Sequence, residues 1–279
     1  FLFLVFFLDV SCQKNILNKA ENLYLNGEYG SAQNIFISQL NKFEKNDYVL
    51  YRIADCSWKL GKSDAKYWYL ELLNNYKNSN YYEKSKFNLA KIYFSNKEYT
   101  NSVQLLSEIS QNKLKSNEFY FKYGYSLFCL DDYDQAKYNF LKVEDGKYKT
   151  LSNYYYAYIL YSQKMYNKSL LVFQTLSEDE TFSKIIPYYI TQIFFSLEKY
   201  SDIIEYAVPL LENIIESREA EMYRIVSDSY YHLNDLKSAK KYFNKFLETD
   251  ADISVLDYFQ IGQINIYLED YSSAIKYLE

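Results

Sequence analysis

The tripeptide Gly61-Lys62-Ser63 matches the end of a phosphate-binding loop, in which backbone amides, a lysine and a hydroxyl hold the phosphates of a nucleotide. That loop also needs a glycine five residues before Gly61, and Cys56 occupies this place. The tripeptide follows a predicted helix, whereas the phosphate-binding loop follows a strand. We therefore interpret Gly61-Lys62-Ser63 as a turn and expect no nucleotide site there.

His232 is the one histidine of the chain, and Asp228 precedes it by one helical turn. The two side chains could support a general base or half of a metal site, but no second histidine exists to complete either. Cys56 and Cys129 are expected to be small core residues. The sequence therefore predicts a protein that is not an enzyme and that has no catalytic residues, no cofactor and no metal site.

The elements that would position functional groups are predicted to be helices. The 279 residues include only six Gly and two Pro, which is too few turn-forming residues for a sandwich or a barrel. Hydrophobic residues make up 49% and aromatic residues 20% of the chain, so it can bury enough apolar surface to offset its ordering entropy. The formal charge of −5 argues against a nucleic-acid partner, which would require a basic surface.

The N-terminal residues Phe1-Leu-Phe-Leu-Val-Phe-Phe-Leu8 form an unbroken apolar run that is too short to span a bilayer. We interpret residues 1–12 as the remnant of a secretory signal, with an apolar turn that packs on the first helices as the alternative. The signal could end by cleavage after Cys12 or by lipidation of Cys12, although Asp9 departs from the lipidation pattern. At the other end the helical pattern stops at Glu279 without a stop signal, so we expect more sequence to follow.

An internal repeat with a period of about 34 residues runs through almost the whole chain. Its marker is an aromatic residue after an acidic or polar one, as in Glu98-Tyr99, Asp132-Tyr133 and Lys199-Tyr200. A small or aliphatic residue stands three positions after each marker, and another small residue stands nine positions before it. The spacing defines eight units over residues 13–279, which start near residues 13, 47, 83, 117, 150, 184, 220 and 255.

Each unit is predicted to form two amphipathic helices, because apolar residues recur three and four positions apart in each half. Short polar turns such as Leu60-Gly61-Lys62 and Leu130-Asp131-Asp132 separate the two halves. The small residues would let two helix backbones approach within about 8–10 Å, and a large side chain would fill the space beside each of them.

This pattern resembles the tetratricopeptide repeat family, whose unit has small residues at its eighth and twentieth places and an aromatic residue at its seventeenth. The resemblance implies an all-α, right-handed superhelical solenoid of about eight helix-turn-helix repeats, stabilised by contacts between neighbouring units. The proline that usually ends a repeat is absent from every unit. Pro209 falls instead inside the predicted second helix of the sixth unit, which it should kink.

The resemblance also implies a binding surface. In the family's superhelix the first helices line a concave groove, and the second, fifth, ninth and twelfth or thirteenth places of each unit face it. These places are rich in aromatic residues here, although an aromatic stripe at helical spacing is more often core than ligand site. The ninth places are acidic toward both ends, at Glu21, Asp55 and Asp228. The predicted groove residues are Tyr51, Trp58, Phe87, Phe121, Tyr125, Tyr154, Tyr158, Tyr161, Tyr188 and Gln192.

The predicted function is a non-catalytic protein-protein interaction scaffold of the bacterial cell envelope, in the periplasm or at the outer membrane. It would bind a peptide or helix of a protein partner in the Tyr-rich groove. Contact with a membrane would occur only through a lipid on Cys12 or a segment beyond Glu279. Two alternatives remain open: an extracytoplasmic sensor region of a longer signalling protein, and a carbohydrate-binding module. The second alternative requires Trp58 and Tyr154 to be exposed to solvent.

Overall fold

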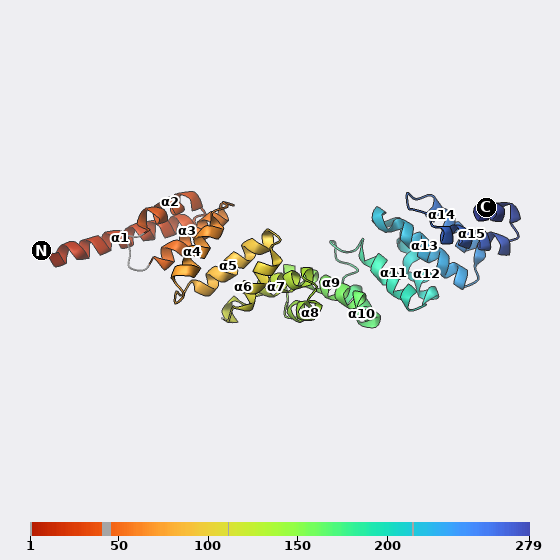
Figure 1. Cartoon of the computed structure of the whole chain (residues 1–279), viewed down its shortest axis with the longest axis horizontal. Coiled ribbons are helices and arrows are strands. Elements are labelled where there is room, and N and C mark those ends of the chain that lie inside the picture. The colour runs from red at the N-terminus through yellow and green to blue at the C-terminus, as the bar shows by residue number, and fades with distance from the viewer. Residues whose placement is uncertain (1, 41–45, 111, 214) are drawn as a thin grey trace. The chain divides into compact units, whose positions relative to one another are not determined.

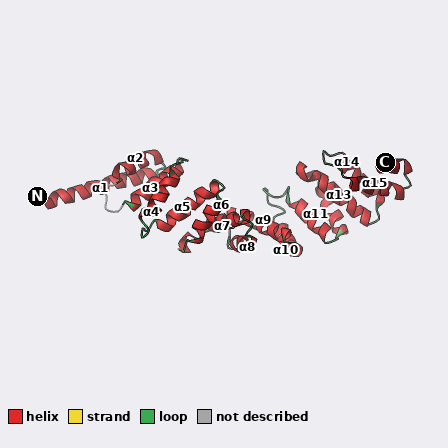
Figure 2. Cartoon of the chain, in the orientation of Figure 1, coloured by secondary structure: helices red, strands yellow, loops and turns green. Residues whose placement is uncertain are grey.

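The computed structural model describes residues 2–40, 46–110, 112–213 and 215–279, with side chains from Lys14 onward except those of residues 113, 213 and 216. Within these ranges the chain forms sixteen α-helices and two short 3-10 helices, and no strand (Figure 1, Figure 2). The helices belong to two compact bodies, the N-terminal body Phe1–Tyr148 and the C-terminal body Lys149–Glu279. The chain is thus an all-α helical repeat solenoid, as the sequence predicted.

Consecutive helices form eight pairs that follow the period of the sequence. The pairs of the N-terminal body are α1 (Leu2–Leu25) with α2 (Tyr29–Gln39), α3 (Asp47–Lys59) with α4 (Ala65–Asn75), α5 (Tyr82–Ser95) with α6 (Tyr99–Ser107), and α7 (Asn117–Cys129) with α8 (Tyr133–Leu141). The 3-10 helix η1 (Asn112–Leu114) lies between α6 and α7. The remaining pairs are α9 (Lys147–Ser162) with α10 (Tyr166–Gln174), α11 (Ile186–Ser196) with α12 (Tyr200–Ala207), α13 (Glu216–His232) with α14 (Leu236–Leu247), and α15 (Val255–Tyr267) with α16 (Tyr271–Leu278).

The turn inside every pair contains one residue in the left-handed backbone region. In the second pair this residue is Gly61, at φ +67°, and its N–H donates to the Trp58 carbonyl at 3.0 Å. The next N–H, of Lys62, donates to the Ser57 carbonyl at 2.9 Å, which completes a Schellman cap of the first helix. The residues at this place are Gly27, Gly61, Lys97, Asp131, Lys164, Glu198, Asn234 and Glu269.

The small residues of the repeat lie where the two helices of a pair meet. Ala32, Ala136 and Ala157 are fully buried. The Phe36 ring packs in the same core as Ala32, and the Phe173 ring packs in the same core as Ala157. Where serine replaces alanine, its hydroxyl donates to a carbonyl of the opposite helix. These bonds are Ser102 Oγ to Ala90 O at 3.2 Å, Ser169 Oγ to Ala157 O at 2.8 Å, and Ser227 Oγ to Ala239 O at 2.8 Å.

Pro209 changes the second helix of its pair, as predicted. Helix α12 ends at Ala207, and the chain continues as the 3-10 helix η2 (Val208–Asn213) around the proline. A proline inside an α-helix has no N–H to donate and its ring collides with the preceding turn, which accounts for the change.

The prediction for the cysteines was half right. Cys56 is fully buried, whereas Cys129 is exposed because it is the last residue of α7. None of the helices in the described ranges is long and apolar enough to cross a bilayer.

Replacing Gly61 tests the left-handed turn. We expect Gly61→Ala to lower the free energy of unfolding by about 1 kcal/mol, because an L-residue with a Cβ is strained at positive φ. Gly61→Asn should cost less than half as much, since asparagine tolerates this region. Urea denaturation followed by circular dichroism measures both. Equal stability of the wild type and Gly61→Ala would contradict the proposed strain.

Alanine should change the free energy of unfolding in opposite directions at two helical glycines, Gly124 and Gly30. A Cβ at Gly124 would lie 3.0 Å from the buried Phe140 ring and 3.3 Å from the Ala136 carbonyl, so Gly124→Ala should destabilise the chain by about 1–2 kcal/mol. A Cβ at Gly30 in α2 would meet nothing within 4 Å, so Gly30→Ala should stabilise it by about 0.5 kcal/mol through helix propensity. The same denaturation experiment compares the two. A gain from Gly124→Ala would show that the helices of this pair are not closely packed.

Candidate functional site

All ten predicted groove residues lie on the first helices of their pairs, five in each body. Four of them are buried and occupy the fifth place of their repeats. The exposed fractions are 2% for Tyr51, 8% for Phe87, 7% for Phe121 and 9% for Tyr188. These four side chains therefore offer a partner little surface.

The fifth-place residues are covered by side chains from the start of the next helix pair. Tyr81, just before α5, stacks on Tyr51 with the ring centroids 5.0 Å apart. Four contacts of the same kind are Phe119 on Phe87 at 5.9 Å, Tyr148 on Phe121 at 5.0 Å, Phe182 on Tyr154 at 4.5 Å, and the Arg218 guanidinium over Tyr188 at 4.6 Å. The fifth place thus joins neighbouring repeats, as large aromatic side chains do at many packed interfaces.

The surface formed by the first helices of the pairs in the N-terminal body, which we call the first-helix face, carries charged residues on α1 and α3 that pair with each other. Arg52 forms an ion pair with Glu21, and its guanidinium lies 4.4 Å from the centroid of the Tyr24 ring. The Tyr48 hydroxyl donates to Glu21 at 2.6 Å. The predicted acidic residue Glu21 therefore has partners within the chain and does not present a free charge.

Asp55, the second predicted acidic residue of this end, is 7% exposed. It accepts hydrogen bonds from the hydroxyls of Tyr24 and, at 3.2 Å, Tyr69. Burial raises the pKa of Tyr48 to about 12, and the hydrogen bond with Glu21 adds to this shift. Burial also raises the pKa of Tyr24, and its hydrogen bond with Asp55 acts in the same direction. The phenols consequently stay protonated and donate to the carboxylates at neutral pH.

Trp58 and Tyr125 are the half-buried members of the predicted set in the N-terminal body. Trp58 packs against the core around Leu50 and Tyr69. The Tyr125 ring contacts Phe94 edge to face at 5.5 Å and Tyr99 at 5.9 Å. Both side chains thus bury part of their rings within the chain.

Three predicted tyrosines of the C-terminal body converge on one residue that the sequence analysis missed. The rings of Tyr154, Tyr158 and Tyr161 lie 6.1, 5.9 and 5.7 Å from the ring of Tyr189, each edge to face. Tyr189 is 8% exposed and stacks on Phe173 at 5.0 Å. Its hydroxyl lies 3.3 Å from that of Tyr154. The one sequence feature that could have indicated Tyr189 is its position next to Tyr188, since two adjacent aromatic residues place their rings on different sides of a helix.

Glu221 of α13 joins the polar side chains of the same face, and the sequence analysis did not predict it. It accepts hydrogen bonds from the Tyr188 hydroxyl at 3.2 Å and from Gln192 Nε2 at 2.7 Å. The Arg224 guanidinium lies 3.7 Å from the Glu221 carboxylate. Burial and the nearby Glu221 charge raise the pKa of Tyr188 to about 12. This face therefore combines tyrosine rings, packed on the buried Tyr189, with an ordered set of donors and acceptors. We call Tyr154, Tyr158, Tyr161, Gln192 and Glu221 the tyrosine face.

A flat aromatic platform for a sugar ring is not formed by Trp58 and Tyr154. Phe182 covers one face of the Tyr154 ring at an interplanar angle of 10°, and Trp58 is partly buried. Sugars stack on open ring faces, so the geometry does not favour the carbohydrate-binding alternative.

Asp228 and His232, the groups with catalytic potential, each contact a residue of a neighbouring helix. Asp228 accepts a hydrogen bond from Gln260, and the ring of His232 stacks on Tyr200 at 4.3 Å. Burial raises the pKa of the Asp228 carboxyl. Within the described ranges no three His, Cys, Asp or Glu residues are placed to hold a metal ion.

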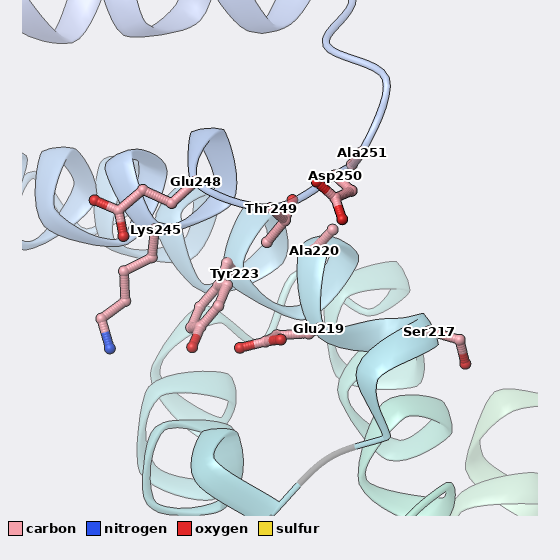
Figure 3. Close-up of a pocket in the computed structure, with 9 residues that line it drawn as sticks. All are labelled: Ser217, Glu219, Ala220, Tyr223, Lys245, Glu248, Thr249, Asp250 and Ala251. Carbon is pink, nitrogen blue, oxygen red and sulfur yellow. The ribbon is translucent and has the colours of Figure 1, made fainter.

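A pocket of about 640 Å³ opens between the start of α13 and the end of α14 (Figure 3). Its wall carries Tyr223, Glu219 and Lys245. Burial and a hydrogen bond with Glu219 raise the pKa of Tyr223 to about 12. The pocket contains none of the predicted site residues.

No protein-family model matches the chain, and no curated protein matches it. Several solved structures do. A tetratricopeptide repeat protein from Parabacteroides merdae is 14% identical over 91% of this chain and 98% of its own, with a TM-score of 0.50. The C-terminal part of a TPR repeat-containing protein from Cytophaga hutchinsonii is 16% identical over 84% and 95%, with a TM-score of 0.58. The Pseudomonas aeruginosa protein PilF is 14% identical over 70% and 88%, with a TM-score of 0.51.

At these identities the likeness concerns the fold and not the activity of the individual proteins. The repeat spacing, the paired helices and the similar solved structures all indicate the same helical repeat fold. This chain resembles the tetratricopeptide repeat proteins and has their helical repeat fold.

Proposed function

We propose that this chain is a non-catalytic scaffold that binds a protein partner through the tyrosine face of its C-terminal body. The tetratricopeptide-like fold supports a protein-interaction scaffold in general terms. The single observation that carries the finer proposal is the convergence of Tyr154, Tyr158 and Tyr161 on Tyr189, beside the bonded pair Gln192 and Glu221.

The tyrosine face suits a peptide or a helix as its ligand. Tyr158 and Tyr161 are half-buried, so part of each ring is anchored and part remains at the surface. Anchored tyrosines supply apolar contact area at a low cost in side-chain entropy, and their hydroxyls can bond to a peptide backbone. Gln192 and Glu221 add polar groups whose positions are already ordered by their mutual hydrogen bond. Affinity would be concentrated on these ordered side chains.

Replacing Tyr158 and Tyr161 together tests this proposal. We expect Tyr158→Ala/Tyr161→Ala to reduce the recovery of a reproducible partner from bacterial envelope extract by at least about tenfold, since anchored aromatic residues typically contribute most to an interface. The measurement is quantitative mass spectrometry of proteins captured by the wild type and by the variant, after circular dichroism has shown equal helicity.

The matched control is Tyr67→Ala/Tyr138→Ala, which removes two tyrosines that are 54% and 57% exposed on the second helices α4 and α8. This control should recover the partner at the level of the wild type. Loss of the partner from the control, with retention by Tyr158→Ala/Tyr161→Ala, would move the binding site to the second helices and refute the proposal.

The location in the cell envelope is the second part of the proposal. It is supported by the apolar run of residues 1–8 and by Cys12 after it, whose side chain lies outside the described part of the structure. A diacylglycerol on Cys12 would provide an anchor for the scaffold.

Expression of the gene in a bacterial host distinguishes the two forms of processing. If Cys12 is lipidated, radioactive palmitate should label the protein, and Cys12→Ser should abolish the label without changing its export. If the signal is cleaved after Cys12, the mature chain should begin at Gln13 and remain unlabelled. An unprocessed protein in the cytoplasm would refute both.

A further inference from the structure

Four lysines of the N-terminal body lie over aromatic rings near the first helices α5, α7 and α9. Lys84 and Lys91 are seven residues apart on α5, Lys122 is on α7, and Lys147 begins α9. The distances from ammonium group to ring centroid are 5.0 Å for Lys84 and Tyr51, 5.0 Å for Lys91 and Phe87, 4.1 Å for Lys122 and Phe94, and 5.0 Å for Lys147 and Tyr148. We call Lys84, Lys91, Lys122 and Lys147 the lysine row. A ring below an ammonium group attracts it through the quadrupole and restricts where it can move.

The positive charge of the lysine row is hardly compensated within the chain. Among the described residues, the one carboxylate within 4.0 Å of the row is that of Glu118, which lies 4.0 Å from the Lys122 ammonium. This one carboxylate acts on Lys122 but does not balance the charge of four lysines. The other lysine of α5, Lys86, differs from the row because it bonds to Glu108 at 2.5 Å.

The lysines of the row also act on one another. The side chain of Lys122 is 15% exposed, and burial is the main cause that lowers the pKa of Lys122. The Glu118 carboxylate opposes this shift, and the positive charges of Lys91 and Lys147 add to it. These charges are therefore near enough to repel one another. A bound anion would relieve this repulsion, because it adds the opposite charge at a site where the positive groups are already held together.

The remainder of this first-helix face does not cancel the row. Glu21 is paired with Arg52, and Asp55 is bonded to the hydroxyls of Tyr24 and Tyr69. Glu21 and Asp55 are thus bonded inside the chain, whereas Lys84 and Lys147 of the row are exposed and Lys91 and Lys122 are partly exposed.

We propose that the lysine row binds an acidic segment of a polypeptide, with several Asp or Glu side chains along one extended stretch. This proposal rests on the proposed function, since it assigns part of the scaffold's protein binding to the N-terminal body. A nucleic acid is the less favoured anion, because the chain carries a net charge of −5 and the row contains no arginine.

Isothermal titration of the whole chain tests the proposal, with a blocked octapeptide of glutamate as the probe. At about 20 mM salt we expect measurable binding of this peptide, weaker binding at about 200 mM, and none of the octapeptide in which glutamine replaces every glutamate. Lys91→Gln/Lys122→Gln should weaken the association constant roughly fivefold or more. Lys84→Gln/Lys147→Gln, which changes two exposed side chains, should also weaken the association constant for the glutamate peptide.

The matched control is Lys97→Gln/Lys142→Gln, which removes two exposed lysines of the same body outside the row. This control should change the association constant less than twofold. Equal weakening by the control would show a response to net charge alone and overturn the proposal. Tighter binding of octathymidylate than of the glutamate peptide would assign the row to nucleic acid instead.

Absence of binding by the glutamate peptide would also overturn this inference. That outcome leaves the proposed function standing if Tyr158→Ala/Tyr161→Ala still loses its partner, because the two proposals rest on different residues and are tested with different variants.

Discussion

The structure depends on the close approach of two helices in each pair, which only small side chains permit. Ala32, Ala136 and Ala157 are fully buried at these contacts, and at Gly124 a Cβ would already press on the Phe140 ring. A serine at such a contact adds a bond between the helices, as from Ser169 to the Ala157 carbonyl. The left-handed residue of each turn follows from this constraint, since the chain must reverse within a few residues to bring the helices together.

Stacking of the pairs decides which parts of the first helices remain for a partner. The ring at the fifth place is covered from the start of the next pair, as Tyr81 covers Tyr51 and Tyr148 covers Phe121. In a repeat protein this contact between neighbours replaces a central core as the source of stability. Tyr158 and Tyr161, at the ninth and twelfth places of their repeat, are left half-buried and keep part of their rings at the surface.

The two bodies present different chemistry on the same kind of helix. The C-terminal body carries the tyrosine face, in which rings converge on Tyr189 and Glu221 orders the polar groups. The N-terminal body neutralises Glu21 and Asp55 internally and leaves the lysine row. In the two proposals, the tyrosine face would bind a polypeptide through apolar contact and hydroxyl groups, and the lysine row would bind one through charge.

The sequence by itself determined the period, the paired helices, the small residues at their contacts and the interruption at Pro209, because each is a local property that recurs every turn or every repeat. It also placed the ten predicted groove residues on the first helices. Only the tertiary structure decided that Tyr51, Phe87, Phe121 and Tyr188 are buried, that Tyr189 and Glu221 contact the predicted residues, and that Glu21 and Asp55 are compensated. Helical spacing shows which side of a helix a residue occupies, but the side chain that covers it comes from the next helix pair, about thirty residues away, and no local pattern specifies that contact.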